Sequence, residues 1–305
     1  MHLGVNLINF GPAATPANLR RWVEVTEGLG YHSLLTSDHV AVTPDVASRY
    51  PAPFYEPLTT LGWLAAATSR LRIGATVMIL PYRNPLETAR AFANLDQLSG
   101  GRVIFGAGIG WAEREFAALG VDHHRRGRMT DEYLEAILRL WSDDTVSFDG
   151  TFVRFDDVDT RPRPLQQPHP PVWIGGSSEA ALRRVVRFGD GWHPIRLRPG
   201  WLRAEGIARL DAAAQAAGVA RPAVCPRIGL HLSATPFDDD ARLMGAGTLD
   251  QIRADLAELF DLGCEHVLLD SSYAGVEGTL EPADAWRALE TIAADAYDLA
   301  AGHPR

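Results

Sequence analysis

The strongest constraint on the fold of this chain is a repeated alternation between short apolar runs and longer amphipathic segments. The runs are rich in Val, Ile and Leu at consecutive positions, which is typical of strands buried on both faces of a parallel sheet. The segments between them carry apolar residues at helical spacing. The predicted strands cover residues 3–9, 33–37, 71–80, 102–107, 172–174, 191–193, 225–232 and 266–270.

Helix signals follow the predicted strands. Thr15-Pro16 and Asn84-Pro85 each place a capping side chain before a proline at the first helical position, and Thr248 with Gln251 forms a capping box. The predicted helices cover residues 16–29, 57–68, 85–99, 129–141, 179–188, 199–217, 249–262 and 281–299. This pattern predicts an α/β fold, the (β/α)8 or TIM barrel, as a single domain over residues 1–305. A doubly wound open sheet is the alternative.

Three segments interrupt the alternation. Residues 145–155 alternate polar and apolar side chains around Asp149-Gly150, which predicts a β-hairpin inserted after the fourth strand. Residues 162–171 form a proline-rich connector. Residues 41–55 form a long loop containing several prolines, of the kind that covers an active site.

Composition excludes several classes of function. Hydrophobic residues make up 46% and charged residues 22% of the 305 positions, as in a soluble globular protein, and a net charge of -9 argues against a nucleic-acid partner. All 29 basic residues are arginine. Without lysine, the chain can use neither a Schiff-base amine nor the lysine of a phosphate-binding loop.

The sequence predicts a cytoplasmic protein with a small-molecule substrate. Its apolar runs are too short to span a membrane, so no membrane partner is expected, and the first residues lack the pattern of a signal peptide. Cys225 and Cys264 are far apart and belong to no motif, so both are expected to be reduced.

Candidate catalytic residues stand where the second predicted strand ends. In a barrel, the active site lies at the carboxyl ends of the strands, and Asp38-His39 falls at such an end, just before the long loop. His39 is predicted to transfer a proton, with a hydrogen-bonded structural histidine as the alternative. Asp38 contributes to the site or only caps the loop, and His193 is a weaker catalytic candidate.

Two glycine-rich stretches follow predicted strands. Residues 106–110 resemble a dinucleotide fingerprint but have Trp111 where a sixth-position glycine is needed and no acidic residue about twenty positions on. Their alternating glycines instead favour close approach of a flat ring to the backbone, with a tight strand end as the plainer explanation. Residues 175–178, Gly-Gly-Ser-Ser, fit either a phosphate site at a helix start or an ordinary helix cap.

No metal site is predicted. His123 and His124 are adjacent in sequence and point in different directions, so a shared ion is not expected. The first strand has Asn6-Leu7-Ile8-Asn9 where metal-dependent barrel hydrolases commonly carry two histidines. Such a hydrolase is the last alternative function.

Taken in order, several motifs resemble the bacterial luciferase-like monooxygenase superfamily, and within it the coenzyme F420-dependent oxidoreductase branch. The resemblance covers nearly the whole chain and is weakest between residues 204 and 247. The motifs that carry it are residues 36–40 (TSDHV), 101–111 (GRVIFGAGIGW), 170–177 (PPVWIGGS) and 189–192 (GDGW).

The resemblance implies a TIM barrel that binds a flavin or deazaflavin at the strand ends, and a homodimer. Asp38 matches a residue that contacts the deazaflavin ring, and His39 matches the proton donor of related dehydrogenases. Further implied cofactor contacts are a cis bulge at Thr76-Val77 behind the ring, the backbone at Gly108 and Ile109, and a phosphate loop comprising Gly175, Gly176, Ser177 and Ser178.

The chain departs from the sugar-phosphate dehydrogenase of this branch. Trp111 stands where that enzyme has a glutamate base, and the lysines that hold its substrate phosphate are absent, so glucose 6-phosphate is not expected as the substrate. Glu113 and Glu115 are nearby acids that could replace the base, while Phe10, Trp111, His193 and the 41–55 loop are expected to shape the pocket.

The predicted function is an F420-dependent oxidoreductase that transfers hydride between C5 of the deazaflavin and a small organic substrate. An FMN-dependent two-component monooxygenase and a non-catalytic flavin-binding relative are the alternatives.

Overall fold

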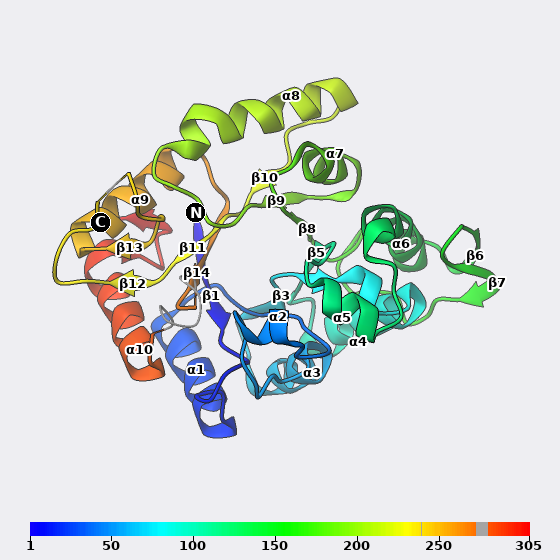
Figure 1. The fold of residues 1–305 in the computed structure, drawn as a ribbon, viewed down its shortest axis with the longest axis horizontal. Helices are drawn as coiled ribbons and strands as arrows, with labels where there is room; N and C mark the ends of the chain where they lie inside the picture. The colour runs from blue at the N-terminus through cyan, green and yellow to red at the C-terminus, as the bar shows by residue number, and fades with distance from the viewer. Residues whose placement is uncertain (239, 273–279) are drawn as a thin grey trace.

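The computed structural model describes residues 1–238, 240–272 and 280–305, and these form a ring of parallel strands with helices outside it (Figure 1). The ring closes because β10 and β11 are parts of one segment, separated only by Cys225 and Pro226, while β10 pairs with β9 and β11 with β14. In pairing order after β10 (Ala223–Val224) come β9 (Gly191–His193), β8 (Val172–Gly175), β5 (Val103–Gly108), β3 (Arg72–Ala75), β2 (Ser33–Thr36), β1 (His2–Leu7), β14 (His266–Asp270) and β11 (Arg227–Gly229). The predicted TIM barrel is confirmed, and the open-sheet alternative is wrong.

The outer layer consists of helices that follow the strands, as predicted. Several begin with the expected signals: the Thr15 and Asn84 side chains cap their helices, and Thr248 and Gln251 form the capping box. The long helices are α1 (Pro16–Leu29), α3 (Pro57–Ala67), α4 (Pro85–Ser99), α6 (Arg126–Ser142), α7 (Glu179–Phe188), α8 (Ile207–Ala217), α9 (Leu249–Asp261) and α10 (Pro282–Thr291).

The third predicted strand is interrupted. It comprises β3 and β4 (Met78–Ile79), with a cis Thr76–Val77 peptide between them. Ile73 and Gly74 pair with Val103 and Ile104, whereas Met78 pairs with Ala107, so this strand contains one extra residue opposite β5. A bulge of this kind re-aims side chains at a barrel rim.

Other boundaries also differ from the predictions. The predicted strand 225–232 is divided between β11 and β12 (His231–Leu232), and the closing helix ends in a π-turn, Ile292–Ala296, rather than at Leu299. The 41–55 loop contains the short helix α2 (Pro44–Ala47). The remaining short elements are α5 (Glu113–Ala118), β13 (Ala246–Gly247), β15 (Tyr297–Asp298), β16 (His303–Pro304), the 3-10 turns Leu80–Tyr82 and His123–Arg125, and a π-turn at Leu202–Gly206.

The predicted hairpin insertion is present as β6 (Thr145–Asp149) and β7 (Arg154–Asp159), and it projects from the barrel at the right of Figure 1. Its turn is held at the barrel by Glu132 of α6, whose carboxylate accepts hydrogen bonds from the backbone N–H groups of Thr151, Phe152 and Val153.

The barrel interior is filled by side chains from alternate strand positions. A central layer comprises Leu35, Ile104, Trp173, Cys225 and Leu268. Trp173 is its largest member. Its ring stacks on His193 toward the carboxyl ends of the strands (5.5 Å between centroids) and contacts His266 toward their amino ends (5.0 Å). The interior is therefore packed between the two ends.

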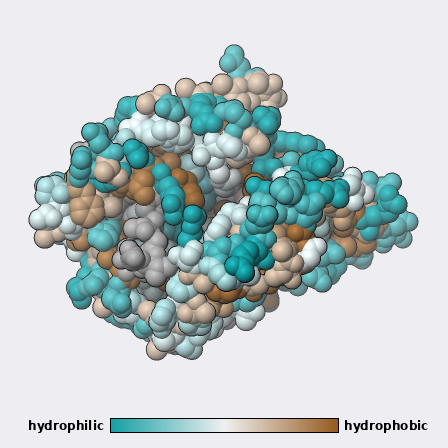
Figure 2. Space-filling view, viewed as in Figure 1, coloured by the Kyte–Doolittle hydropathy of each residue, from teal (hydrophilic) through white to brown (hydrophobic). Residues whose placement is uncertain are grey.

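On the face shown in Figure 2, hydrophilic residues predominate around the periphery, and the surface is hollowed near its centre. No helix in the described parts of the chain is long and apolar enough to cross a membrane. Cys225 and Cys264 are both free and buried, as expected.

Candidate active site

A cavity of about 220 Å³ opens at the carboxyl ends of the barrel strands. It brings together eight of the predicted site residues: Asp38, His39, Thr76, Val77, Gly108, Ile109, Gly175 and Gly176. Ser177 and Ser178 follow directly but do not line it. The remaining lining residues are Ser37, Tyr50, Ile79, Gly110, Trp111, His193, Ile195 and Arg227.

His39 is held in place by Glu115. The Nδ1 atom of His39 lies 2.7 Å from Oε2 of Glu115, and both side chains are buried. The same carboxylate accepts hydrogen bonds from the backbone N–H groups of Val40 and Ala41 and from the Tyr82 hydroxyl. A carboxylate can only accept, so Nδ1 of His39 carries the proton and Nε2 is left for the cavity.

The pKa of Glu115 lies below its ordinary value. Burial alone would raise the pKa, but the hydrogen bond and charge interaction with His39 and the backbone N–H groups of Ala41 and Val40 outweigh that effect. Glu115 is therefore ionised at neutral pH. These contacts favour a positioning role for Glu115 over that of a free base, and the identity of any base stays a prediction; Glu113 is exposed at the start of α5.

Aromatic rings surround His39. Tyr50 and Phe54 of the 41–55 loop contact its ring, with centroid distances of 4.9 and 5.6 Å, and Trp111 contacts it edge-on at 5.9 Å. Phe10 stacks on Phe54 behind this wall and does not line the cavity itself. The long loop thus covers one side of the site, as predicted.

Asp38 is fixed by an ion pair. Its carboxylate receives two hydrogen bonds from Arg83, at 2.7 and 2.9 Å, and one from the backbone N–H of Ile79 at 2.8 Å. Burial lowers the pKa of Arg83, but the attraction of Asp38 and Glu56 outweighs this and raises it. Asp38 therefore anchors β4, on the far side of the bulge, to the end of β2.

Thr76 and His193 form a buried hydrogen-bonded pair on the cavity floor. Nδ1 of His193 lies 2.5 Å from the carbonyl oxygen of Cys225, and Nε2 lies 2.7 Å from the Thr76 hydroxyl. Burial, together with the positive charge of Arg227, lowers the pKa of His193 to about 4, although the hydrogen bond to the Cys225 carbonyl opposes this shift. Neutral His193 thus donates from Nδ1 and accepts the Thr76 hydroxyl proton at Nε2.

Arg227 connects this pair to Asp270. Its guanidinium donates to the Thr76 carbonyl (2.9 Å) and makes two hydrogen bonds to Oδ2 of Asp270 (2.9 and 2.5 Å). The other carboxylate oxygen accepts from Asn6 and Ser272. Burial raises the pKa of Asp270, but these partners outweigh it and lower the pKa overall. The network links β1, β14, β11 and β9 to the bulge.

The glycines at 106, 108 and 110 are required by packing around this bulge. A Cβ on Gly106 would lie 2.0 Å from the Ala75 carbonyl oxygen, and one on Gly108 would lie 2.4 Å from Cγ2 of Val77. Gly110 has φ +75° and faces Ile79. A tight strand end therefore accounts for Gly106, which does not line the cavity. Gly108 and Gly110 line the cavity, where a flat ring could approach the backbone.

Ser177 and Ser178 lie at the start of α7. Ser178 is the helix cap, with its hydroxyl accepting from the Ala181 N–H at 3.2 Å. Gly176 has φ +102°, and its carbonyl accepts a hydrogen bond from Trp192. Arg209 of α8 donates to the Ser177 carbonyl and to Glu179. The cap interpretation holds for Ser178, and the phosphate role of both serines stays a prediction.

Several residues that position the site carry no clear signal in the sequence. Its motifs single out neither Arg83 nor Arg227, and they indicate Glu115 only as a base. A signal existed for Arg227: it lies two residues after Cys225 on an inward-facing strand position, where Asp270 of the adjacent strand requires a cation. Arg83 directly follows a 3-10 turn and Glu115 lies in the six-residue helix α5, and in such short elements residue spacing carries no such information.

Known proteins resemble this chain in sequence. Residues 1–255 match the family model described as luciferase-like monooxygenase. An uncharacterized protein of Mycobacterium tuberculosis is 32% identical over 205 residues, covering 63% of this chain and 71% of that protein. An FMNH(2)-dependent dimethylsulfone monooxygenase of Pseudomonas putida is 37% identical over 142 residues, covering 46% of this chain and 39% of the enzyme.

Solved structures share the fold over almost the full chain. Monooxygenase RslO1 from Streptomyces bottropensis aligns with a TM-score of 0.78 and 24% identity, covering 96% of this chain and 98% of that one. An F420-dependent secondary alcohol dehydrogenase aligns with a TM-score of 0.76 and 18% identity, covering 94% and 98%. With five sixths of its length matched by the family model, the chain belongs to the luciferase-like monooxygenase family.

Proposed function

We propose that this protein is a coenzyme F420-dependent oxidoreductase that transfers hydride between the deazaflavin C5 and a small organic substrate. The observation that carries the proposal is the His39–Glu115 pair at the wall of the cavity. A deazaflavin supplies the carbon that gives or accepts hydride. The chain must then supply a proton-transfer group, a dry pocket and a fixed position for both reactants.

His39 supplies the proton transfer. When hydride adds to a carbonyl carbon, the oxygen gains negative charge and must take up a proton, and the reverse reaction must remove one. Ionised Glu115 accepts from Nδ1 and stabilises the imidazolium, so Nε2 of His39 can donate or accept at the cavity. The surrounding rings of Tyr50, Phe54 and Trp111 limit access of water to this nitrogen.

The cavity residues fit a flat heterocycle. The hydroxyl of Ser37, a cavity residue, is buried and has no hydrogen-bond partner among the described residues, which leaves it free for a polar edge of a ring. Gly108, Ile109 and the Thr76–Val77 bulge would hold the ring faces. A volume of about 220 Å³ is below the range of roughly 300–1,000 Å³ for whole ligands, so a cofactor side chain would extend outside, toward Ser177 and Ser178.

The second candidate is an FMN-dependent two-component monooxygenase. One observation favours it: the dimethylsulfone monooxygenases, at 37% and 32% identity over parts of the chain, use FMNH(2) according to their names. The chain spans less than half of those enzymes' length, so their substrate is not carried over. The same cavity would then hold the flavin ring.

Parallel fluorescence titrations of the purified protein with F420 and with FMN test the proposal. We expect F420 to bind more tightly than FMN. We also expect the absorbance of bound F420 to change when substrate is added, and this change to be lost in His39→Ala. Tighter binding of FMN, with oxygen uptake when reduced flavin is supplied, would establish the second candidate. Binding of neither would leave a protein without flavin chemistry and overturn both.

A further inference from the structure

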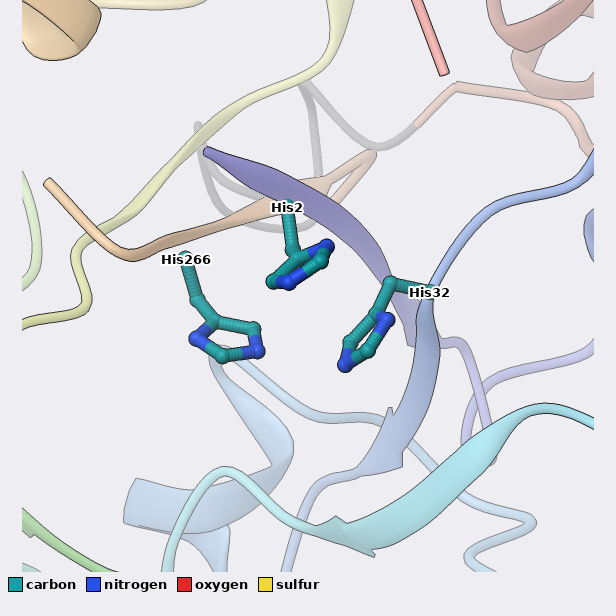
Figure 3. A group of neighbouring side chains, drawn as sticks. All are labelled: His2, His32 and His266. Atoms are coloured by element: carbon teal, nitrogen blue, oxygen red, sulfur yellow. The ribbon is translucent and has the colours of Figure 1, made fainter. Parts of the chain in front are cut away.

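Three histidines gather at the amino ends of the barrel strands, at the opposite end from the active site. His2 begins β1, His266 begins β14, and His32 immediately precedes β2 (Figure 3). His2 and His266 are register partners in adjacent strands. One ring nitrogen from each lies within 4.8 Å of the others, and Figure 3 shows the rings arranged around a common space.

His266 has unsatisfied hydrogen-bonding capacity. It is only 7% exposed, and neither of its ring nitrogens has a hydrogen-bond partner among the described residues. Its neighbours are the rings of His2, His32 and Trp173, all about 5.0 Å away. A buried polar group without a partner is costly, so an imidazole in this position points to a ligand that would engage its nitrogen.

We propose that His2, His32 and His266 form a binding site for a divalent transition-metal ion of the zinc class. Neutral imidazole nitrogen is a good ligand for Zn²⁺, Co²⁺, Ni²⁺ and Cu²⁺, and three histidines leave a fourth position for water or a carboxylate.

Two charged side chains and the amino-terminal ammonium group lie near the site, and the ammonium group, like Arg72, carries a positive charge. Arg72 disfavours a further cation, but its guanidinium is engaged by the Val103 carbonyl and Gln166. Glu265 favours a cation: its carboxylate lies 3.4 Å from Nδ1 of His266 and is exposed, so it can swing into the fourth position. The exposed His2, now stacked on His32 at 4.0 Å, is the ligand that rotates to shorten the nitrogen separations.

A bound ion would cross-link β14, β1 and β2 at the amino ends of the barrel strands. An ion bound only by the folded state raises the melting temperature, and the increase grows with the logarithm of the free-ion concentration once that exceeds the dissociation constant. Flavin binding, at the other end of the strands, is not expected to change, so failure of this site and failure of the proposed function are distinguishable.

Calorimetric titration of chelator-treated protein with ZnCl₂, and absorbance with CoCl₂, test the site. One ion per chain and a higher melting temperature with Zn²⁺ are expected. His2→Ala should weaken binding by about 100-fold or more, beyond the 10–100-fold cost of losing an outer partner. His124→Ala, an exposed histidine elsewhere, is the matched control and should bind normally.

Because His2 is exposed, its alanine variant is expected to keep the native fold, which far-ultraviolet circular dichroism verifies. Absence of saturable binding by the unaltered protein would overturn the proposal. So would equal Zn²⁺ affinity in His2→Ala and the unaltered protein, because the ion would then be bound elsewhere.

Discussion

Glu115 acts on the site through His39. Replacing it by glutamine keeps the shape of the side chain but removes the negative charge that orients and stabilises the imidazolium. We expect Glu115→Gln to lower kcat by about 10²–10⁴-fold. The pH profile should change as well, which a merely structural role would not produce. Glu113→Gln, exposed on the same helix, is the control and should leave both unchanged.

Ser177 and Ser178 can be separated by their different contacts. Ser178 caps α7, so Ser178→Ala should lower the free energy of unfolding by about 1 kcal/mol even without cofactor. Ser177 is exposed, so Ser177→Ala should leave the free energy of unfolding unchanged and weaken cofactor binding if this loop holds a phosphate. Urea denaturation and cofactor titration of both variants measure this. Unchanged cofactor affinity in both variants would contradict the phosphate role.

At the scale of the element, the bulge between β3 and β4 determines the shape of the site. A Cβ on Gly108 would meet Val77 at 2.4 Å, so Gly108→Ala must displace the bulge or the ring-binding face. We expect a loss of about 1–3 kcal/mol in the free energy of unfolding, together with weaker cofactor binding.

Gly28→Ala in α1 is the matched control. A Cβ there meets nothing within 4 Å, and the residue is helical, so alanine should stabilise the protein by about 0.5–1 kcal/mol. Thermal denaturation compares the two variants. Equal stability of both would show that the close approach at Gly108 is easily relieved.

Most elements were predictable because local patterns specify them. Apolar runs identified the strands, and Thr15, Asn84 and Thr248 marked helix starts. The division of residues 71–80 was not visible in that pattern, because the run stays apolar across Thr76–Val77 while the pairing with β5 changes register. Short α5 was missed because six residues show too little periodicity.

At the scale of the whole molecule, the site is assembled by barrel closure. The topology predicted that Asp38, Thr76, Gly108 and Gly175 would meet, because the carboxyl ends of parallel strands share one rim. It could not predict that Glu115 would turn back to His39, because that contact depends on a loop path between distant residues. The three histidines at the other end lie at or beside the starts of adjacent strands, so the same topology argument, applied to the amino ends, brings them together as well.

Stability should fall as the solution becomes mildly acidic. His193 has a pKa near 4 in the folded protein, below its ordinary value of 6.5. Between pH 4 and 6.5, protons therefore bind the unfolded chain in preference to the folded one. The contribution of His193 to the free energy of unfolding is therefore fully present above pH 6.5. As the pH falls toward 4, up to about 3 kcal/mol of this contribution is lost. Urea denaturation from pH 4 to 7 measures the slope.

His193→Asn keeps a donor for the Cys225 carbonyl but cannot be protonated in this range. The variant should show a shallower slope between pH 4 and 6.5 than the unaltered protein. Identical slopes would mean that the residue is not buried in its neutral form.

The indole in the middle of the barrel has an evolutionary consequence. A Cβ on Gly191 would lie 2.8 Å from Cδ1 of Trp173, so the indole occupies the space that a larger residue at 191 would need. Neither position can change freely while the other stays. Among relatives that differ here, alanine at 191 is expected to accompany a smaller side chain at 173, and an alignment of the family would reveal the two positions as a covarying pair.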